Sequence, residues 1–287
     1  MRNIDAKGRL PNFKGAAIGN GVCHGCEYSS DAQKAAVFGG HAMIPLSLQA
    51  DIAAECGDFS KESEKCSELI GSIRDFTGDY NTYNIYDTCG SDTAAGADHA
   101  RALLRSGVAD VRGARDAFTV QPAYKQARAA RALGGALNDY TCGGETAMDA
   151  WLANDRVRRA LHVDDAKSGG SYHSDATDHF ELYQNLTKKY RMIIYSGDVD
   201  DCVPYWGSQT WTANLGYEVA EPWHPWYSDS LAHKGEVVAG YAIKYRVPDA
   251  EHDFQFVTVK GAGHMVPTYK PVFALTFLTK FLKGEDF

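Results

Sequence analysis

Two short strand-like segments, each followed by a glycine-bounded loop, constrain the fold of this chain more than any other feature. Residues 192–195 are wholly apolar, as in a strand buried on both faces, and residues 254–259 carry the β-branched pattern of a second strand. Helical patterns fill the neighbouring stretches 180–190, 205–215 and 269–282. Strands mixed with helices in this way predict the α/β class for the second half of the chain.

The composition excludes several classes of protein. The 287 residues include 29 Lys and Arg against 37 Asp and Glu, a net charge of −8, so the chain lacks the overall basic charge of a nucleic-acid binder. Hydrophobic residues make up 44%, which argues against wholesale disorder. No apolar run approaches the ~18 residues of a membrane span. We therefore expect a globular protein with neither a nucleic acid nor a membrane as partner.

Both strand-like segments lead into loops with titratable side chains. The first loop, residues 195–204, holds three aspartates, and the second, residues 260–267, holds His264. In open α/β sheets, loops at the ends of strands carry ligands and catalytic groups. An acid followed later in the chain by a histidine is also the order found in α/β-hydrolases. A histidine base needs a carboxylate to hold one tautomer, so the two loops predict part of a catalytic triad.

Asp200 is the expected acid among the three aspartates. In hydrolase turns of this type the acid four residues before the proline faces the histidine, and the proline here is Pro204. Asp198 is expected to cap the turn by accepting hydrogen bonds from nearby backbone amides. The alternative is that these are ordinary acidic turn residues and that His264 is a surface histidine. The order of the two loops favours the catalytic interpretation.

The seven cysteines bear on metal binding and on compartment. Cys23 and Cys26 have the C-x-x-C spacing of half a zinc site or a redox pair, but no second pair follows and the flanking sequence is loop-like. A disulfide-bearing secreted or lumenal protein without a structural metal is the simpler interpretation, and a glycosylation sequon at Asn185 agrees with it. Residues 1–7 lack the apolar stretch of a signal peptide, so we expect that the beginning of the protein is missing.

Other patterns receive structural interpretations. Ser60 is expected to cap an amphipathic helix whose apolar positions include Ile70 and Ile73. Residues 91–138 are rich in Ala and Arg, which leaves a low-complexity helix and a flexible insertion both open. The aromatic cluster at residues 223–227 is interpreted as a packed loop, because no basic residue interleaves it as in a base-stacking platform.

Stretches spread over nearly all of the chain resemble the serine carboxypeptidase family and keep its order. They are residues 13–21, 84–87, 151–163, 194–204, 223–226, 238–241 and 256–267. The resemblance implies the C-terminal part of an α/β-hydrolase fold with a helical cap insertion, and cofactor-free release of C-terminal residues from peptides at acidic pH. It also implies that residues 1–27 and 146–287 belong to the hydrolase core and residues 28–145 to the cap, with 91–138 as a variable loop.

The sequence departs from the family at the nucleophile. The family motif G-E-S-Y-A-G is absent, and no other G-x-S-x-G occurs in the 287 residues. In the family the nucleophile precedes the segment that resembles residues 13–21, so Asp200 and His264 are expected to be two thirds of a triad. The resemblance also implies two disulfides, Cys56–Cys66 and Cys89–Cys142. It leaves three cysteines without a match: Cys23, Cys26 and Cys202.

Three functions remain open at this point. The chain is the C-terminal part of a serine carboxypeptidase that is inactive alone, a catalytically dead hydrolase-like binding protein, or an acyltransferase on the same fold. The expected partners are a peptide substrate and either a second copy or the missing N-terminal segment. The family implies a lysosomal, vacuolar or secreted location.

One specificity residue is also expected. In relatives, the residue after the histidine lines the pocket for the departing C-terminal residue, so Met265 is expected to favour apolar leaving residues. The alternative is that Met265 only packs beneath its loop.

Overall fold

The computed structural model describes residues 12–23, 26, 30–59, 63–78, 80–86, 152–163, 179–230 and 234–287. The chain divides into two compact units. The first comprises Met1–Gly78, Tyr83–Ile85 and Ala176–Phe287, and the second Asp79–Thr82 and Tyr86–Asp175. In the second unit, helix α9 (Asp155–Ala160) begins where the Asn154 side chain accepts a hydrogen bond from the Arg156 amide at 2.9 Å. The domain boundaries inferred from the sequence stay a prediction.

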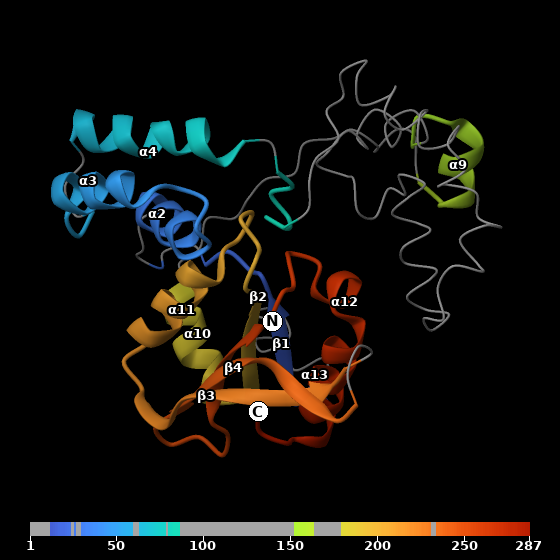
Figure 1. The fold of residues 1–287 in the computed structure, drawn as a ribbon. Coiled ribbons are helices and arrows are strands. Elements are labelled where there is room, and N and C mark those ends of the chain that lie inside the picture. The colour runs from blue at the N-terminus through green and yellow to red at the C-terminus, as the bar shows by residue number, and fades with distance from the viewer. Residues whose placement is uncertain are drawn as a thin grey trace. The chain divides into compact units, whose positions relative to one another are not determined.

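A five-stranded mixed sheet forms the centre of the first unit (Figure 1). Its order is β1 (Gly15–Gly19), β2 (Arg191–Gly197), β5 (Phe254–Val259), β4 (Glu236–Arg246) and β3 (Glu218–Asp229). β1, β2 and β5 run parallel, whereas β4 and β3 are antiparallel to their neighbours. Gly197 pairs with Val259, so β2 and β5 end at the same edge. The loops that follow these strands therefore start side by side, as expected of an α/β fold.

Helices cover the two faces of the sheet, and each face has its own apolar cluster (Figure 1). On one face lie α10 (His179–Thr187) and α11 (Tyr205–Asn214), where Trp211 is buried with Met192 and Phe256. On the other face lie α12 (Val266–Tyr269) and α13 (Pro271–Lys283), where Phe277 packs against Ile193 and Val257. Successive β2 residues thus face opposite clusters, which explains why the strand is apolar throughout.

Three further helices belong to the first unit: α2 (Ser30–Gly40), α3 (Leu46–Cys56) and α4 (Glu64–Thr77). The Cys56–Cys66 disulfide joins α3 to α4 and confirms the predicted pairing. The cap of α4 was expected at Ser60 and is instead Ser63, whose hydroxyl accepts a hydrogen bond from the Cys66 amide at 3.0 Å. Ser63 has the extended backbone that a cap requires and stands three residues before the amide it satisfies. Cys89–Cys142 lies outside the described residues.

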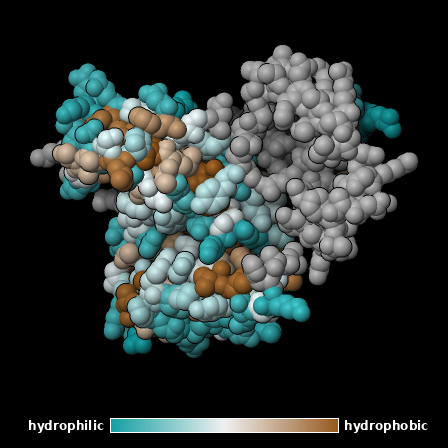
Figure 2. Space-filling view, in the orientation of Figure 1, coloured by the Kyte–Doolittle hydropathy of each residue, from teal (hydrophilic) through white to brown (hydrophobic). Residues whose placement is uncertain are grey.

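These helices expose apolar side chains and enclose a pocket. Figure 2 shows hydrophobic surface among hydrophilic side chains over α2–α4, and Leu46 is 81% exposed. Ala32, Ala36, Ile52 and Trp206 are among the side chains that line a pocket of about 410 Å³ between α2, α3 and the start of α11. Among the described residues, no helix is long and apolar enough to cross a bilayer.

The aromatic cluster at residues 223–227 lies in strand β3, which corrects the packed-loop interpretation. Strand β3 contains two prolines, Pro222 and Pro225, and it is the edge strand of the described sheet, where a missing N–H is tolerated. An irregularity in the β3–β4 register between Glu221 and His224 falls at Pro222, whereas Pro225 is in regular register with Tyr241. Trp226 is buried, and its indole N–H donates to the Thr258 carbonyl oxygen at 2.9 Å. This hydrogen bond links β3 to β5 inside the core.

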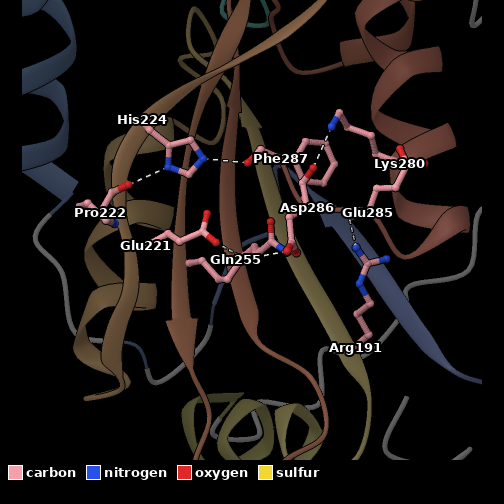
Figure 3. Close-up of polar contacts among 10 residues, drawn as sticks. Arg191, Glu221, Pro222, His224, Gln255, Lys280, Glu285, Asp286 and Phe287 are labelled. Atoms are coloured by element: carbon pink, nitrogen blue, oxygen red, sulfur yellow. Dashed lines mark hydrogen bonds and ion pairs between the residues drawn. The ribbon is translucent and has the colours of Figure 1, made fainter.

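Polar contacts hold residues 284–287 against the sheet (Figure 3). The Lys244 ammonium bridges the carboxylates of Glu221 and Asp286, and the His224 imidazole lies 2.7 Å from the Phe287 main-chain oxygen. Phe287 itself is buried in the same cluster as Phe277. Arg191 of β2 donates to the Glu285 main-chain oxygen, and Lys280 of α13 donates to that of Asp286. Side chains from three strands and α13 thus hold residues 284–287 against the core.

Candidate active site

Asp200 and His264 meet above the carboxyl ends of β2 and β5. Nδ1 of His264 lies 2.9 Å from Oδ2 of Asp200, although 64 positions separate the two residues. The Asp200 side chain is 0% exposed, whereas that of His264 is 29% exposed. A buried carboxylate is thereby hydrogen-bonded to an imidazole that still reaches solvent. The structure brings together the acid and the histidine that the sequence predicted, and their catalytic role remains a proposal.

Two further donors hold the carboxylate of Asp200. The Asn20 amide donates to Oδ2 at 2.6 Å, and the Cys202 backbone N–H donates to Oδ1 at 2.8 Å. An ionised carboxylate only accepts hydrogen bonds, so Nδ1 of His264 must carry the proton of their shared bond. In the neutral imidazole this leaves Nε2 as the basic nitrogen. The arrangement therefore selects the tautomer that a general base needs.

Asn20 belongs to the site but was not predicted from the sequence. It directly follows β1, its backbone N–H donates to the Tyr195 carbonyl oxygen at 2.9 Å, and it is almost fully buried. Its φ of 43° lies in the left-handed region, which asparagine tolerates better than most residues. The sequence does contain a signal for this residue. Asn20 stands between Gly19 and Gly21, in a turn directly after a strand.

Asp198 accepts a hydrogen bond from the backbone, but from the histidine loop rather than from the nearby amides of its own turn that the sequence interpretation expected. Its Oδ1 accepts a hydrogen bond from the Gly261 N–H at 2.6 Å, which ties the acid loop to the histidine loop. Burial raises the pKa of the Asp198 carboxyl, and the Gly261 hydrogen bond opposes that rise. The positive φ of 69° at Gly261 favours glycine at this junction. Asp198 therefore holds the two loops together rather than contacting the imidazole.

Met265 follows the histidine and sits at the N-cap position of α12, half-buried. Its place beside His264 agrees with contact to a leaving group, and that role stays a prediction. Cys202, between the acid and α11, is a free cysteine whose residue is exposed overall. Partial burial of its sulfur, followed by the charges of Asp200 and Asp201, raises the pKa of its thiol. Cys23 and Cys26 form a disulfide with each other.

The site has the groups for proton transfer. Among the described residues, no group of three or more His, Cys, Asp or Glu side chains could hold a metal ion. The Asp200–His264 pair could accept a proton from a hydroxyl placed at Nε2 and return it to a leaving group. No serine of the chain stands in a G-x-S-x-G motif.

A comparison with protein families identifies the family of the chain. The model of the family described as serine carboxypeptidase matches residues 1–284. The chain belongs to the serine carboxypeptidase family. Members of this family are serine-type hydrolases, and the sequence resemblance is thereby confirmed.

Curated relatives match nearly all of this family member. Serine carboxypeptidase-like 20 of Arabidopsis thaliana is 32% identical over 96% of the chain, which spans 57% of the relative. Serine carboxypeptidase 1 of Hordeum vulgare is 30% identical, with the same shares of 96% and 57%. The lysosomal protective protein of Mus musculus is 27% identical over 96% of the chain and 60% of the relative. The chain thus spans somewhat more than half the length of these relatives.

A solved structure shares the fold. Kex1(delta)p, a prohormone-processing carboxypeptidase from Saccharomyces cerevisiae, superposes with a TM-score of 0.51 and 13% sequence identity, covering 99% of this chain and 58% of that one. At that identity the likeness concerns the fold alone. Together with the mixed sheet and its covering helices, it supports the predicted α/β class and its assignment to part of an α/β-hydrolase fold.

Proposed function

We propose that this chain supplies the acid and the base of a serine-type carboxypeptidase that releases C-terminal residues from peptides at acidic pH. The observation that carries the proposal is the bond between His264 Nδ1 and the buried Asp200 carboxylate at 2.9 Å. A buried acid that orients an imidazole is the part of a triad that activates a serine. Membership of the serine carboxypeptidase family supplies the reaction class.

The proposed mechanism uses each contact of the pair. With its Nδ1–H donating a hydrogen bond to the Asp200 carboxylate, His264 presents Nε2 to the serine hydroxyl and accepts its proton as the serine oxygen attacks the peptide carbonyl. The resulting imidazolium is stabilised by the Asp200 carboxylate, which Asn20 and the Cys202 amide keep in place. The imidazolium then gives the proton to the departing amine. Water next attacks the acyl-serine and gives a proton to Nε2 of His264, which passes it to the serine oxygen as that bond breaks and the acid product leaves.

The nucleophile must come from outside these 287 residues, because they contain no G-x-S-x-G motif. We therefore propose that the chain alone is inactive and works with a segment that carries the family motif. Within the described residues, β1 is an edge strand whose outer side has no paired strand, which fits the addition of another strand there. The alternative partner is a second copy of the chain, and measuring the molar mass in solution distinguishes the two.

The proposed compartment is lysosomal, vacuolar or secreted. The disulfides Cys23–Cys26 and Cys56–Cys66 favour an oxidising environment. One relative bears the name lysosomal protective protein, which agrees with that location. Fractionation of cells that express a tagged chain tests this proposal, and a purely cytosolic distribution would count against it.

The experiment compares the chain alone with a completed protein, meaning this chain joined to a family segment that carries G-E-S-Y-A-G. We expect release of the terminal residue from a blocked dipeptide, and labelling by a serine-directed phosphonate, only for the completed protein. Activity of the chain alone that the phosphonate abolishes would refute the requirement for an added nucleophile. A folded completed protein without either property would support the binding-protein alternative, and preferential acyl transfer to alcohols would support the acyltransferase.

A further inference from the structure

A short segment outside both loops is bonded to each of them. The Tyr83 carbonyl oxygen accepts a hydrogen bond from the His264 N–H at 2.8 Å, and the Ile85 N–H donates to the Val199 carbonyl oxygen at 3.0 Å. Val199 immediately precedes Asp200. Residues 83–85 are therefore attached at the histidine itself and next to the acid, which links the backbones that carry the pair.

The side chain of Tyr83 reaches the imidazole directly. Its ring stacks on that of His264 with centroids 4.9 Å apart and planes 17° from parallel. A ring that covers one face of the imidazole opposes rotation out of the plane in which Nδ1 meets Asp200. The face of an aromatic ring also attracts a cation, so the same stack favours the imidazolium formed during catalysis. Hydrogen bond and stack restrain His264 from two directions.

The histidine loop is shaped for this approach. Gly263 lies against the Tyr83 carbonyl oxygen, and a Cβ at position 263 would overlap that oxygen. Glycine therefore lets the backbone of the loop come close enough for the His264 N–H to reach Tyr83. The packing of residues 83–85 on this loop is thus part of its backbone conformation as well as a contact between side chains.

We propose that Tyr83 is a positioning residue for His264. Its main-chain oxygen holds the histidine backbone, and its ring keeps the imidazole plane aligned for the bond to Asp200. The inference rests on the proposed function in so far as His264 is the catalytic base. It goes beyond that function by assigning a role to a segment that precedes the acid by more than a hundred positions. The competing explanation is that Tyr83 merely fills space beside the loop.

The chain itself, without any nucleophile, tests the proposal by proton NMR. The resonance of the Nδ1 proton, identified by its loss in His264→Gln, should appear far downfield, and the carbon-bound ring protons of His264 should be shifted upfield by the Tyr83 ring. We expect Tyr83→Phe to preserve both signatures. Tyr83→Leu should lose the upfield shift and broaden the Nδ1 proton through exchange with water.

Two results would overturn the inference. One is a folded Tyr83→Leu variant, judged by circular dichroism, in which the Nδ1 proton exchanges as slowly as in the wild type. The other is the absence of the upfield shift in the wild-type chain, which would show that the rings do not stack. The upfield shift is measured on the wild-type chain and needs no variant. If Tyr83→Leu does not fold, Tyr83→Met, which also lacks a ring, takes its place.

The completed protein separates this inference from the proposed function. Tyr83→Leu should lower kcat about 100-fold with little change in KM, as expected when a catalytic group moves by roughly 1 Å, and Tyr83→Phe should retain activity. If His264→Ala abolishes activity while Tyr83→Leu leaves kcat unchanged, the role of Tyr83 is wrong and the function stands. If His264→Ala is also without effect, the proposed function is wrong.

Discussion

His224 should stabilise the fold more at acidic than at alkaline pH. Its Nδ1 lies 2.7 Å from the Pro222 carbonyl oxygen and its Nε2 2.7 Å from the Phe287 main-chain oxygen (Figure 3). A neutral imidazole has a single N–H and donates to only one of these oxygens, whereas the imidazolium donates to both. Protonated His224 therefore ties β3 to the segment that places Phe287 in the core.

The sign of the pH dependence follows from the surroundings of the imidazole. The hydrogen bonds to Phe287 and Pro222 raise the pKa of His224, with a smaller rise from Glu221, while burial and Lys244 lower it. Residues 284–287 carry two acidic side chains, Glu285 and Asp286, and Asp286 is paired with Lys244. Because the folded pKa is raised, the stabilisation is fully present below the unfolded pKa of about 6.5 and disappears as pH rises through the folded pKa.

The magnitude is modest because the ring is only half-buried. A hydrogen bond from a charged donor contributes about 1.5–3 kcal/mol, and solvent screening at such a site reduces this to about 1 kcal/mol. For a domain of this size, that corresponds to a shift in Tm of roughly 2–4 °C. We expect His224→Gln to lower Tm by this amount near pH 5 (about one and a half units below the unfolded pKa) and by much less near pH 8.

Thermal unfolding of the chain, followed by circular dichroism, measures the effect. His252→Gln, in the turn between β4 and β5, is the matched control for loss of a histidine elsewhere. A difference in Tm between wild type and His224→Gln that is the same at both pH values would refute the reasoning, because it would assign the effect to packing rather than to the second hydrogen bond.

Three further predictions follow from individual contacts. Trp226→Phe leaves the Thr258 carbonyl oxygen without its indole donor and should lower the free energy of unfolding by about 1–3 kcal/mol in denaturant titrations, with Trp223→Phe as the exposed control. Replacing both Cys56 and Cys66 with serine should cost about 2–4 kcal/mol in the same assay, and an unchanged midpoint would show that the bridge between α3 and α4 is not stabilising. In the completed protein, Met265→Glu should shift the kcat/KM ratio for peptides ending in Arg over Leu about tenfold, a change of roughly 1.4 kcal/mol, and an unchanged ratio at equal stability would leave Met265 as a packing residue.

Local sequence patterns were sufficient for β2 and β5 and for the Asp200–His264 pair that these strands position. The apolar run of β2 is buried on both faces, and such a run carries its own signal. Parallel neighbours end at one edge, so the loops with Asp200 and His264 could be expected to meet. The burial of β2 follows from its own residues, and the meeting of the two loops follows from the general rule that parallel neighbouring strands end at one edge of a sheet.

Contacts between distant segments were not predictable in the same way. Asn20 and Tyr83 reach the site from β1 and from the segment at residues 83–85, and neither has a local pattern that announces a contact with Asp200 or His264. The strand containing Trp223 was interpreted as a packed loop, and its prolines fit a strand only at a sheet edge, which depends on the tertiary arrangement. Ser63 was missed because nearby Ser60 offered an equivalent capping side chain.

The central claim is that Asp200 orients His264 as the base of a serine-type hydrolase. Its most direct test is kcat of the completed protein on a blocked dipeptide for Asp200→Asn and His264→Ala, with Asp201→Asn as the neighbouring control. Because asparagine would favour the wrong histidine tautomer, we predict a loss of roughly 10⁴-fold for Asp200→Asn, near-complete loss for His264→Ala, and a small change for Asp201→Asn. Full activity of Asp200→Asn together with loss in Asp201→Asn would contradict the assignment of the acid, and full activity of His264→Ala would contradict the account as a whole.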